Sequence, residues 1–256
     1  MIHPQAIVED GAIIADDVFV GPWSYIESGV KIDSGTRVES HVVLRGPTTI
    51  GHNNHIYQFA SVGEATPDLK YQGEPTRLVI GDNNRIRENV TIHRGTIQDR
   101  SETTIGNNNL IMAYVHVGHD SFIGDNTILV NNVALAGHVH VGNWAILSGY
   151  TLVHQFCMIG AHAFTGMGTS VGKDIPAYMT ASGSPAEIKT INAEGLRRRG
   201  FSADTISELR RAYKIIYRQG LTIDIALERL DEMLKDTPEL NVLIESLRKS
   251  ERGIVR

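Results

Sequence analysis

The histidines are the side chains of this sequence best suited to acid–base chemistry. The chain has 256 residues and eleven histidines, and it offers few other reactive groups. His119, His138 and His154 each follow an aliphatic residue, those three aliphatic residues are 18 positions apart, and His116 and Asp120 flank His119. A histidine titrates near neutral pH and can act as a general base, while a neighbouring carboxylate fixes its tautomer. If 18 residues make one coil, these side chains share one wall.

Three kinds of site fit such a wall. The first is a general base that deprotonates a hydroxyl group. The second is a metal site, in which three ring nitrogens converge on one ion at about 2.1 Å. In the third, the histidines only bond to backbone and water, and the chain is a non-catalytic scaffold. The residues alone leave all three open.

An aliphatic residue recurs every six positions over most of the chain. The series covers residues 2–62, 80–92 and 105–171, and Thr165 is its one polar member. A period of six fits neither an α-helix nor a flat sheet of alternating strands. It predicts short strands joined by tight bends, in which Gly, Asn and Asp supply the bend conformations.

Three such hexads close one triangular coil of 18 residues, and stacked coils pair each strand with its neighbours above and below at ~4.8 Å. The sequence therefore predicts a parallel β-helix. Hexapeptide repeats of this kind resemble the left-handed β-helix acyltransferase superfamily, and the left hand is implied by that resemblance alone. The metal alternative corresponds to the zinc carbonic anhydrases that have the same repeat.

Two interruptions break the hexad series. Residues 68–79 lose the pattern and predict a polar loop, which on a rigid scaffold is a common place for specificity. The second interruption, at 96–104, is shorter, and we expect it only to shift the register.

Beyond residue 187 the period of six ends and apolar residues fall at helical spacing. Ser202 and Thr222 are placed to cap helices, and Gly200 and Gly220 separate them. We therefore expect a β-helix domain at 1–187 and a C-terminal α-helical bundle at 188–256.

Composition narrows the classes of partner. A formal net charge of -5 argues against a general nucleic-acid binder, and no apolar run approaches the ~18 residues of a membrane span. The single cysteine, Cys157, occupies an interior hexad position, and with the absence of a secretory leader it points to the cytoplasm. The tail at 187–256 holds 14 of the 24 Lys and Arg residues against 12 acidic ones, so it is either an ordinary solvated face or a docking surface for an acidic partner.

Several longer sequence segments show a closer resemblance, which covers essentially the whole chain. They are similar to the UDP-N-acetylglucosamine O-acyltransferases of lipid A synthesis. The strings are IYQFASVGE at Ile56, DLKYQGEPTR at Asp68, RIRENVTIHRGT at Arg85, HVGHD at His116, LAGHV at Leu135, VHQFCMIGAH at Val153 and NAEGLRRRGF at Asn192.

The resemblance implies transfer of an R-3-hydroxyacyl group from acyl carrier protein to the 3-hydroxyl of UDP-N-acetylglucosamine, the first step of lipid A synthesis. It implies a homotrimer with sites between subunits, and neither a metal nor another cofactor. It also implies that His119 is the general base, that Asp120 orients it, and that the Gly137 N–H stabilises the oxyanion.

Substrate contacts are implied in the same way. Asp68 and Lys70 hold sugar hydroxyls and a phosphate, because carboxylates accept from hydroxyls and cations pair with phosphate. The other implied contacts are His116, His138, His154 and Gln155 for the sugar and acyl group, Asn192, Glu194, Arg198 and Arg199 for uridine diphosphate, and Arg197, Arg198, Arg199, Arg210 and Arg211 for the acidic carrier protein.

At three places the sequence departs from the family pattern, and these departures limit how far the family's residue roles apply to this chain. Met167 stands where relatives that accept long acyl chains have glycine, so we expect a shortened groove and a chain nearer ten carbons than fourteen. Pro67 and the pair Ser184-Pro185 replace more polar residues, which removes a nucleotide contact or two from the expected set.

Overall fold

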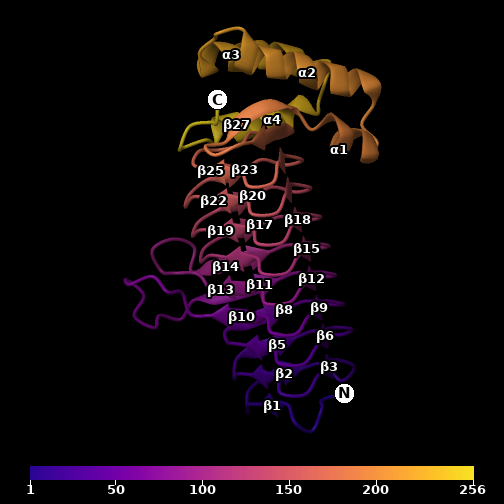
Figure 1. The fold of residues 1–256 in the computed structure, drawn as a ribbon, viewed down its shortest axis with the longest axis vertical. Helices are drawn as coiled ribbons and strands as arrows, with labels where there is room; N and C mark the ends of the chain where they lie inside the picture. Colours follow the sequence, from indigo (N-terminus) through magenta and orange to yellow (C-terminus); the bar gives the residue numbers. More distant parts are fainter.

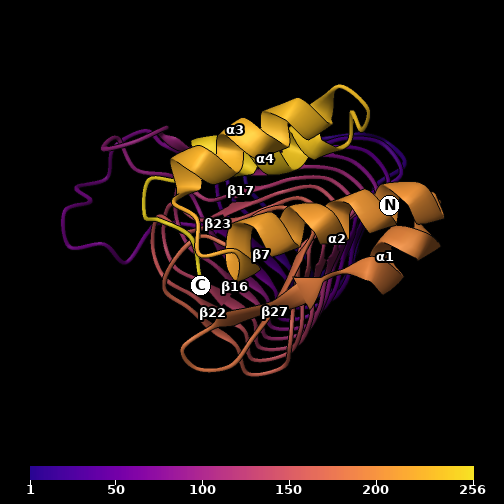
Figure 2. The ribbon, with the colours of Figure 1, turned by 90° about the horizontal axis from the view of Figure 1, so that it is seen from above.

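Short parallel strands form a triangular prism that is closed at one end by helices (Figures 1 and 2). The structure, a computed structural model, describes residues 1–256. The strands make three sheets, here called faces I, II and III, and successive strands of the chain belong to successive faces. This arrangement confirms the predicted parallel β-helix and the helical C-terminus.

The strands pair with those one coil away. Face I contains β1 (Ile7–Val8), β4 (Tyr25–Ile26), β7 (Val43–Leu44), β10 (Ser61–Glu64), β13 (Thr91–His93), β16 (His116–Val117), β19 (Ala134–Leu135), β22 (Leu152–Val153) and β25 (Ser170–Val171). Face II contains β2 (Ile13–Ile14), β5 (Val30–Ile32), β8 (Thr48–Ile50), β11 (Arg77–Ile80), β14 (Glu102–Ile105), β17 (Phe122–Ile123), β20 (His140–Val141) and β23 (Met158–Ile159). Face III contains β3 (Phe19–Val20), β6 (Arg37–Val38), β9 (His55–Ile56), β12 (Arg85–Ile86), β15 (Leu110–Ile111), β18 (Ile128–Leu129), β21 (Ile146–Leu147), β24 (Phe164–Thr165), β26 (Met179–Ser182) and β27 (Glu187–Ile191), the last pair antiparallel.

The hexad aliphatic residues fill the inside of the prism. Val117 pairs with Leu135, and Leu135 pairs with Val153, so identical hexad places stack in columns. All three are buried. Thr165 is the polar exception, and its hydroxyl oxygen accepts from the N–H of Ser148, 3.1 Å away. Its polar group is therefore satisfied inside the core.

Buried amides join the coils at the corner between faces II and III. The Asn54 side-chain oxygen accepts from the N–H of Asn84, and that of Asn84 accepts from the N–H of Asn109, both at 2.9 Å. The Asn109 oxygen in turn accepts from the N–H and the hydroxyl of Thr127. Each coil is thus fixed on the next by bonds that are shielded from water.

Both interruptions of the hexad series leave the prism at the corner between faces I and II, here called corner I–II. The first lies between β10 and β11, at residues 65–76, and the second between β13 and β14, at residues 94–101. The predicted loop at 68–79 is correct in its first part, but its last residues belong to β11 because Leu78 pairs with Thr48.

Four helices cover the end of the prism, namely α1 (Ala193–Arg198), α2 (Ala203–Arg218), α3 (Ile223–Leu234) and α4 (Leu240–Arg248) (Figure 2). The Ser202 and Thr222 side chains accept from the N–H groups of Thr205 and Ile225, which confirms the predicted caps. Helix α4 is tied to the last coil by Ser246, whose hydroxyl accepts from Ala177 N–H. None of the four helices has the length and apolar character that a bilayer crossing requires.

The helical tail shares one hydrophobic core with the prism. The predicted domain boundary, after residue 187, falls at the start of β27, which pairs with β26 on face III. An open β-helix end exposes unpaired backbone and apolar side chains, so the tail serves as its cap.

Candidate active site

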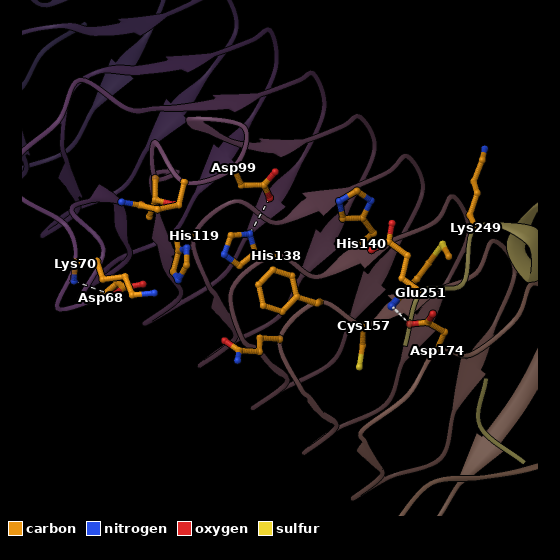
Figure 3. Close-up of a pocket in the computed structure, with 15 residues that line it drawn as sticks. Asp68, Lys70, Asp99, His119, His138, His140, Cys157, Asp174, Lys249 and Glu251 are labelled. Carbon is orange, nitrogen blue, oxygen red and sulfur yellow. Dashed lines mark hydrogen bonds and ion pairs between the residues drawn. The ribbon is translucent and has the colours of Figure 1, made fainter. Parts of the chain in front are cut away.

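A cleft of about 700 Å³ runs along corner I–II (Figure 3). Successive coils contribute one part each. Asp68 and Lys70 come from the loop at 65–76, His119 follows β16, His138 follows β19, and Gln155 follows β22. The structure therefore brings together five of the residues that the sequence singled out.

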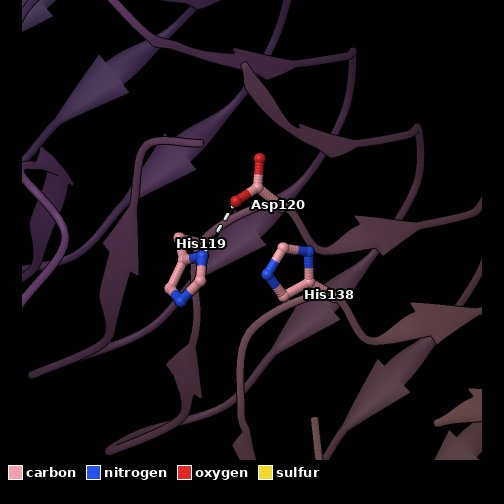
Figure 4. A group of neighbouring side chains, drawn as sticks. All are labelled: His119, Asp120 and His138. Atoms are coloured by element: carbon pink, nitrogen blue, oxygen red, sulfur yellow. Dashed lines mark hydrogen bonds and ion pairs between the residues drawn. The ribbon is translucent and has the colours of Figure 1, made fainter. Parts of the chain in front are cut away.

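His119 and Asp120 form a dyad (Figure 4). The His119 Nδ1 lies 2.8 Å from an Asp120 carboxylate oxygen, so Nδ1 carries the proton and Nε2 is left as the basic nitrogen. The Asp120 side chain is fully buried. Burial opposes its ionisation, but hydrogen bonds from His119 and Thr96 outweigh this effect and hold the pKa of Asp120 below its usual range.

His138 belongs to a second histidine–carboxylate pair. Its Nδ1 lies 2.7 Å from a carboxylate oxygen of Asp99, which belongs to the loop at 94–101. Its ring stacks on Phe156 at 4.3 Å and meets the His119 ring edge to face at 4.9 Å between centroids. Two oriented imidazoles thus face the same cleft.

Gly137 lies directly against the His119 ring. A Cβ at this position would come within 2.5 Å of His119 Nε2, so no other residue fits there without displacing the imidazole. The chain offers no acceptor to the Gly137 N–H. A free backbone donor beside a basic nitrogen is the pairing that a reaction through an oxyanion needs.

The other two expected histidines line a different hollow. His116 and His154 border an apolar groove of about 440 Å³ on face I, beside Leu135 and Leu152. The His116 Nδ1 lies 2.8 Å from the Thr91 hydroxyl. The four histidines therefore divide into two pairs on adjoining surfaces.

Behind His116 lies His93, which the sequence reasoning did not select. Burial and the nearby His116 lower the pKa of His93 to about 4, and burial also lowers that of His116. The His93 Nδ1 is buried without a hydrogen-bond partner. Both rings remain neutral near pH 7.

The residues expected to bind uridine diphosphate lie at another corner, between faces II and III. The Arg199 guanidinium donates to the Trp144 carbonyl at 2.9 Å, and Asn192 caps α1 by accepting from Gly195 N–H. Glu194 pairs with Arg198. None of these side chains lines the cleft that contains His119.

Met167 occupies the third corner, between faces III and I, in the turn that joins β24 to β25. Its side chain is 80% exposed. The candidate base, the residues expected to contact the nucleotide and the expected chain-length residue thus lie at three different corners of one prism.

Sequence reasoning missed Thr96 and Asp99, both in the interruption that we expected only to shift the register. That expectation is wrong, because this loop supplies hydrogen bonds to both dyads. The sequence contained one signal for this role. The interruption falls between a face I hexad and a face II hexad, and His119 falls at the same point of the next coil.

The donor set favours a base over a metal ligand. His119, Asp120 and His138 are the one group of three whose ligand atoms lie within 4.8 Å of one another. Both Asp120 oxygens already accept from Thr96, and one also accepts from His119. Two ring nitrogens remain, whereas a histidine-based zinc site needs three.

A covalent acyl intermediate would need a nucleophile, and the thiol does not suit that role. Cys157 is buried at its interior hexad position, as predicted. Burial raises its pKa to about 11, so it stays a thiol near neutral pH. Direct transfer to an activated hydroxyl is the chemistry that the cleft supports.

Comparison with known proteins now identifies the family. A family model described as UDP-N-acetylglucosamine O-acyltransferase, domain 2, matches residues 174–255, and the bacterial transferase hexapeptide model matches 11–46 and 102–137. A Saccharophagus degradans protein named acyl-(acyl-carrier-protein)–UDP-N-acetylglucosamine O-acyltransferase is 66% identical over 100% of this chain and 99% of its own. The chain belongs to the UDP-N-acetylglucosamine O-acyltransferase family.

Solved structures of this acyltransferase family agree with the fold. LpxA of Acinetobacter baumannii is 50% identical with a TM-score of 0.98, covering 100% of this chain and 99% of that one. The UDP-N-acetylglucosamine acyltransferase of Arabidopsis is 36% identical with a TM-score of 0.87, covering 100% of each chain. The predicted left-handed parallel β-helix with a helical C-terminus is thereby confirmed.

The neutral His93 gives the stability of this acyltransferase a specific pH dependence. Its pKa is about 4 when folded against an ordinary 6.5. Between pH 6.5 and pH 4 the unfolded chain takes up a proton at His93, whereas the folded chain does not. The contribution of neutral His93 to the free energy of unfolding is therefore complete above pH 6.5 and is lost as the pH falls toward 4. On acidification we expect the free energy of unfolding to fall less steeply in His93→Gln than in the unmodified protein. The two slopes differ by up to about 1.4 kcal/mol per pH unit.

Urea denaturation at several pH values between 7 and 4 measures this slope. His52→Gln changes an exposed histidine and serves as the matched control, with the slope of the unmodified protein. Equal slopes for His93→Gln and the unmodified protein would contradict the assignment.

Proposed function

We propose that this chain transfers an R-3-hydroxyacyl group from acyl carrier protein to the 3-hydroxyl of UDP-N-acetylglucosamine, the first step of lipid A synthesis. The single observation that carries the proposal is the His119–Asp120 dyad with its basic nitrogen beside Gly137. The names of the full-length relatives support the same substrates.

The reaction needs one proton transfer in each direction. His119 Nε2 takes the proton of the sugar 3-hydroxyl as its oxygen attacks the thioester carbonyl, and Asp120 stabilises the imidazolium through Nδ1–H. The Gly137 N–H stabilises the oxyanion. When the oxyanion collapses, the C–S bond breaks and the carrier thiol leaves with the proton from His119.

The rest of the cleft positions the acceptor. Asp68 accepts hydrogen bonds from sugar hydroxyls, and the Lys70 ammonium faces a phosphate. His138 and Gln155 lie beside them and complete the sugar and acyl contacts. His116 and His154 belong to the adjoining apolar groove, where they flank the acyl chain.

The separation of the functional residues on three corners supports a homotrimer. One prism cannot bring Arg199 or Met167 to His119, because rigid faces keep the corners apart. Parallel packing of three prisms places one corner of each chain against a neighbour. Asn192, Glu194, Arg198 and Arg199 then bind the diphosphate and uridine at a neighbour's cleft.

The helical tail is the docking surface that we propose for acyl carrier protein. Arg210 and Arg211 are exposed on α2, and Arg197 and Arg198 are exposed on α1. An acidic partner is drawn to such a basic surface, chiefly through its association rate. We propose the cytoplasm as the location, where a buried, unpaired thiol such as that of Cys157 is usual.

The transferase activity is tested with radiolabelled UDP-N-acetylglucosamine and a panel of R-3-hydroxyacyl carrier proteins. We expect product that is insensitive to chelators, and a loss of at least about a thousandfold in His119→Ala. His52→Ala, at an exposed histidine away from the cleft, is the control. Zinc in stoichiometric amount with chelator-sensitive hydration of carbon dioxide would favour the carbonic anhydrase alternative, and a folded protein without turnover or nucleotide binding would favour the scaffold.

The trimer is tested by mixing two inactive variants. His119→Ala and Arg199→Ala chains are refolded together, so that some sites pair an intact His119 with an intact Arg199 of the neighbour. Random pairing restores about a quarter of the wild-type activity. Each variant refolded alone is the control, and activity of the mixture equal to the mean of the two controls would place both residues in one chain's site.

The chain-length role of Met167 is tested by Met167→Gly. Removing the thioether lengthens the groove, so we expect the ratio of kcat/KM for ten-carbon over fourteen-carbon donors to fall by at least about tenfold. Met112→Gly, on the same corner several coils earlier, is the control and leaves the ratio unchanged. A wild-type preference for fourteen carbons would refute the assignment.

A further inference from the structure

We propose that Thr96 is a positioning residue that acts on His119 through Asp120. This inference rests on the proposed function, since it concerns the same dyad. It gives the loop at 94–101 a part in catalysis, although none of the loop's residues exchanges a proton with substrate.

Thr96 surrounds the Asp120 carboxylate with donors. The Thr96 N–H lies 2.9 and 3.0 Å from the two carboxylate oxygens, and the hydroxyl donates to the second oxygen at 2.6 Å. That same oxygen lies 2.8 Å from His119 Nδ1. Because both Thr96 and Asp120 are buried, water cannot replace a lost donor.

The loop holds Thr96 in this place from both sides. The Thr96 carbonyl accepts from the Ser101 N–H at 2.9 Å, and this bond joins the two ends of the loop. The preceding Gly95 approaches Glu102 so closely that a Cβ would lie 2.2 Å from the Glu102 nitrogen. Thr96 is therefore fixed before substrate binds, and it fixes Asp120 in turn.

The Thr96 hydroxyl acts as a hydrogen-bond donor to Asp120, which suits a positioning role. An ionised carboxylate only accepts, so the hydroxyl must donate to it and cannot compete for the His119 proton. With two fixed donors on Thr96, the carboxylate cannot rotate away from Nδ1. Orientation of the imidazole, rather than its basicity alone, then depends on a residue that lies 24 positions from Asp120 in the sequence.

The test compares three variants in the assay described above. Thr96→Val keeps the shape and the N–H but removes the hydroxyl, and we expect kcat to fall about tenfold to a hundredfold with KM for UDP-N-acetylglucosamine unchanged, as for loss of one hydrogen bond to a buried charge. Thr96→Ser keeps the hydroxyl and restores kcat. Thr103→Val is the matched control, because Thr103 is equally buried and its hydroxyl has no partner.

A double-mutant cycle with Asp120→Asn separates positioning from a structural effect. If Thr96 acts through the carboxylate, Thr96→Val lowers kcat no further in the Asp120→Asn protein. Equal losses in both backgrounds, or a kcat for Thr96→Val equal to that of the unmodified and Thr103→Val proteins, would overturn the proposal. Failure of the proposed function is a different result, namely an unmodified protein without transferase activity.

Discussion

The 18-residue coil is the constraint on which the rest of this structure depends. Because each coil has the same three sides, a residue in a coil without an insertion stacks on the one 18 positions later at the strand spacing of ~4.8 Å. The column of Val117, Leu135 and Val153 shows this register. The buried amides of Asn54, Asn84 and Asn109, which are 30 and 25 positions apart, keep the coils aligned where the two insertions lengthen the chain. Within the hexad series, the register therefore determines which residues of successive coils meet at one corner.

The cleft that contains His119 lies at a corner of the prism rather than on a face. Strand residues alternate between the core and the outer surface, whereas each corner is a bend. Asp120, His138 and Phe156 have φ values of 58°, 62° and 65°, which turn the chain sharply at this corner. The two loops leave from the same corner, so they add polar groups to the cleft without disturbing the hydrophobic columns.

The sequence predicts the parts of this structure that repeat or that are local. Six-residue periodicity places Val117 and Cys157 inside, and the caps at Ser202 and Thr222 follow from their own side chains. The periodicity does not predict the contact of Thr96 with Asp120, because a residue in a loop outside the hexad series cannot be assigned to a position in a coil. Nor does it place Arg199, whose position is set by packing of the helical tail against the last coils.

Burial also sets the charge of the histidines near the proposed base, His119. Burial and the nearby His116 lower the pKa of His93, and burial lowers that of His116, so both rings are neutral near pH 7. A positive charge on either ring would oppose protonation of His119, the base that we propose. The negative charge nearest His119 is Asp120, held ionised by hydrogen bonds despite full burial. The proposed base His119 thus lies beside one anion fixed by hydrogen bonds and one further imidazole, that of His138, which meets it edge to face and directs its own Nδ1 to Asp99.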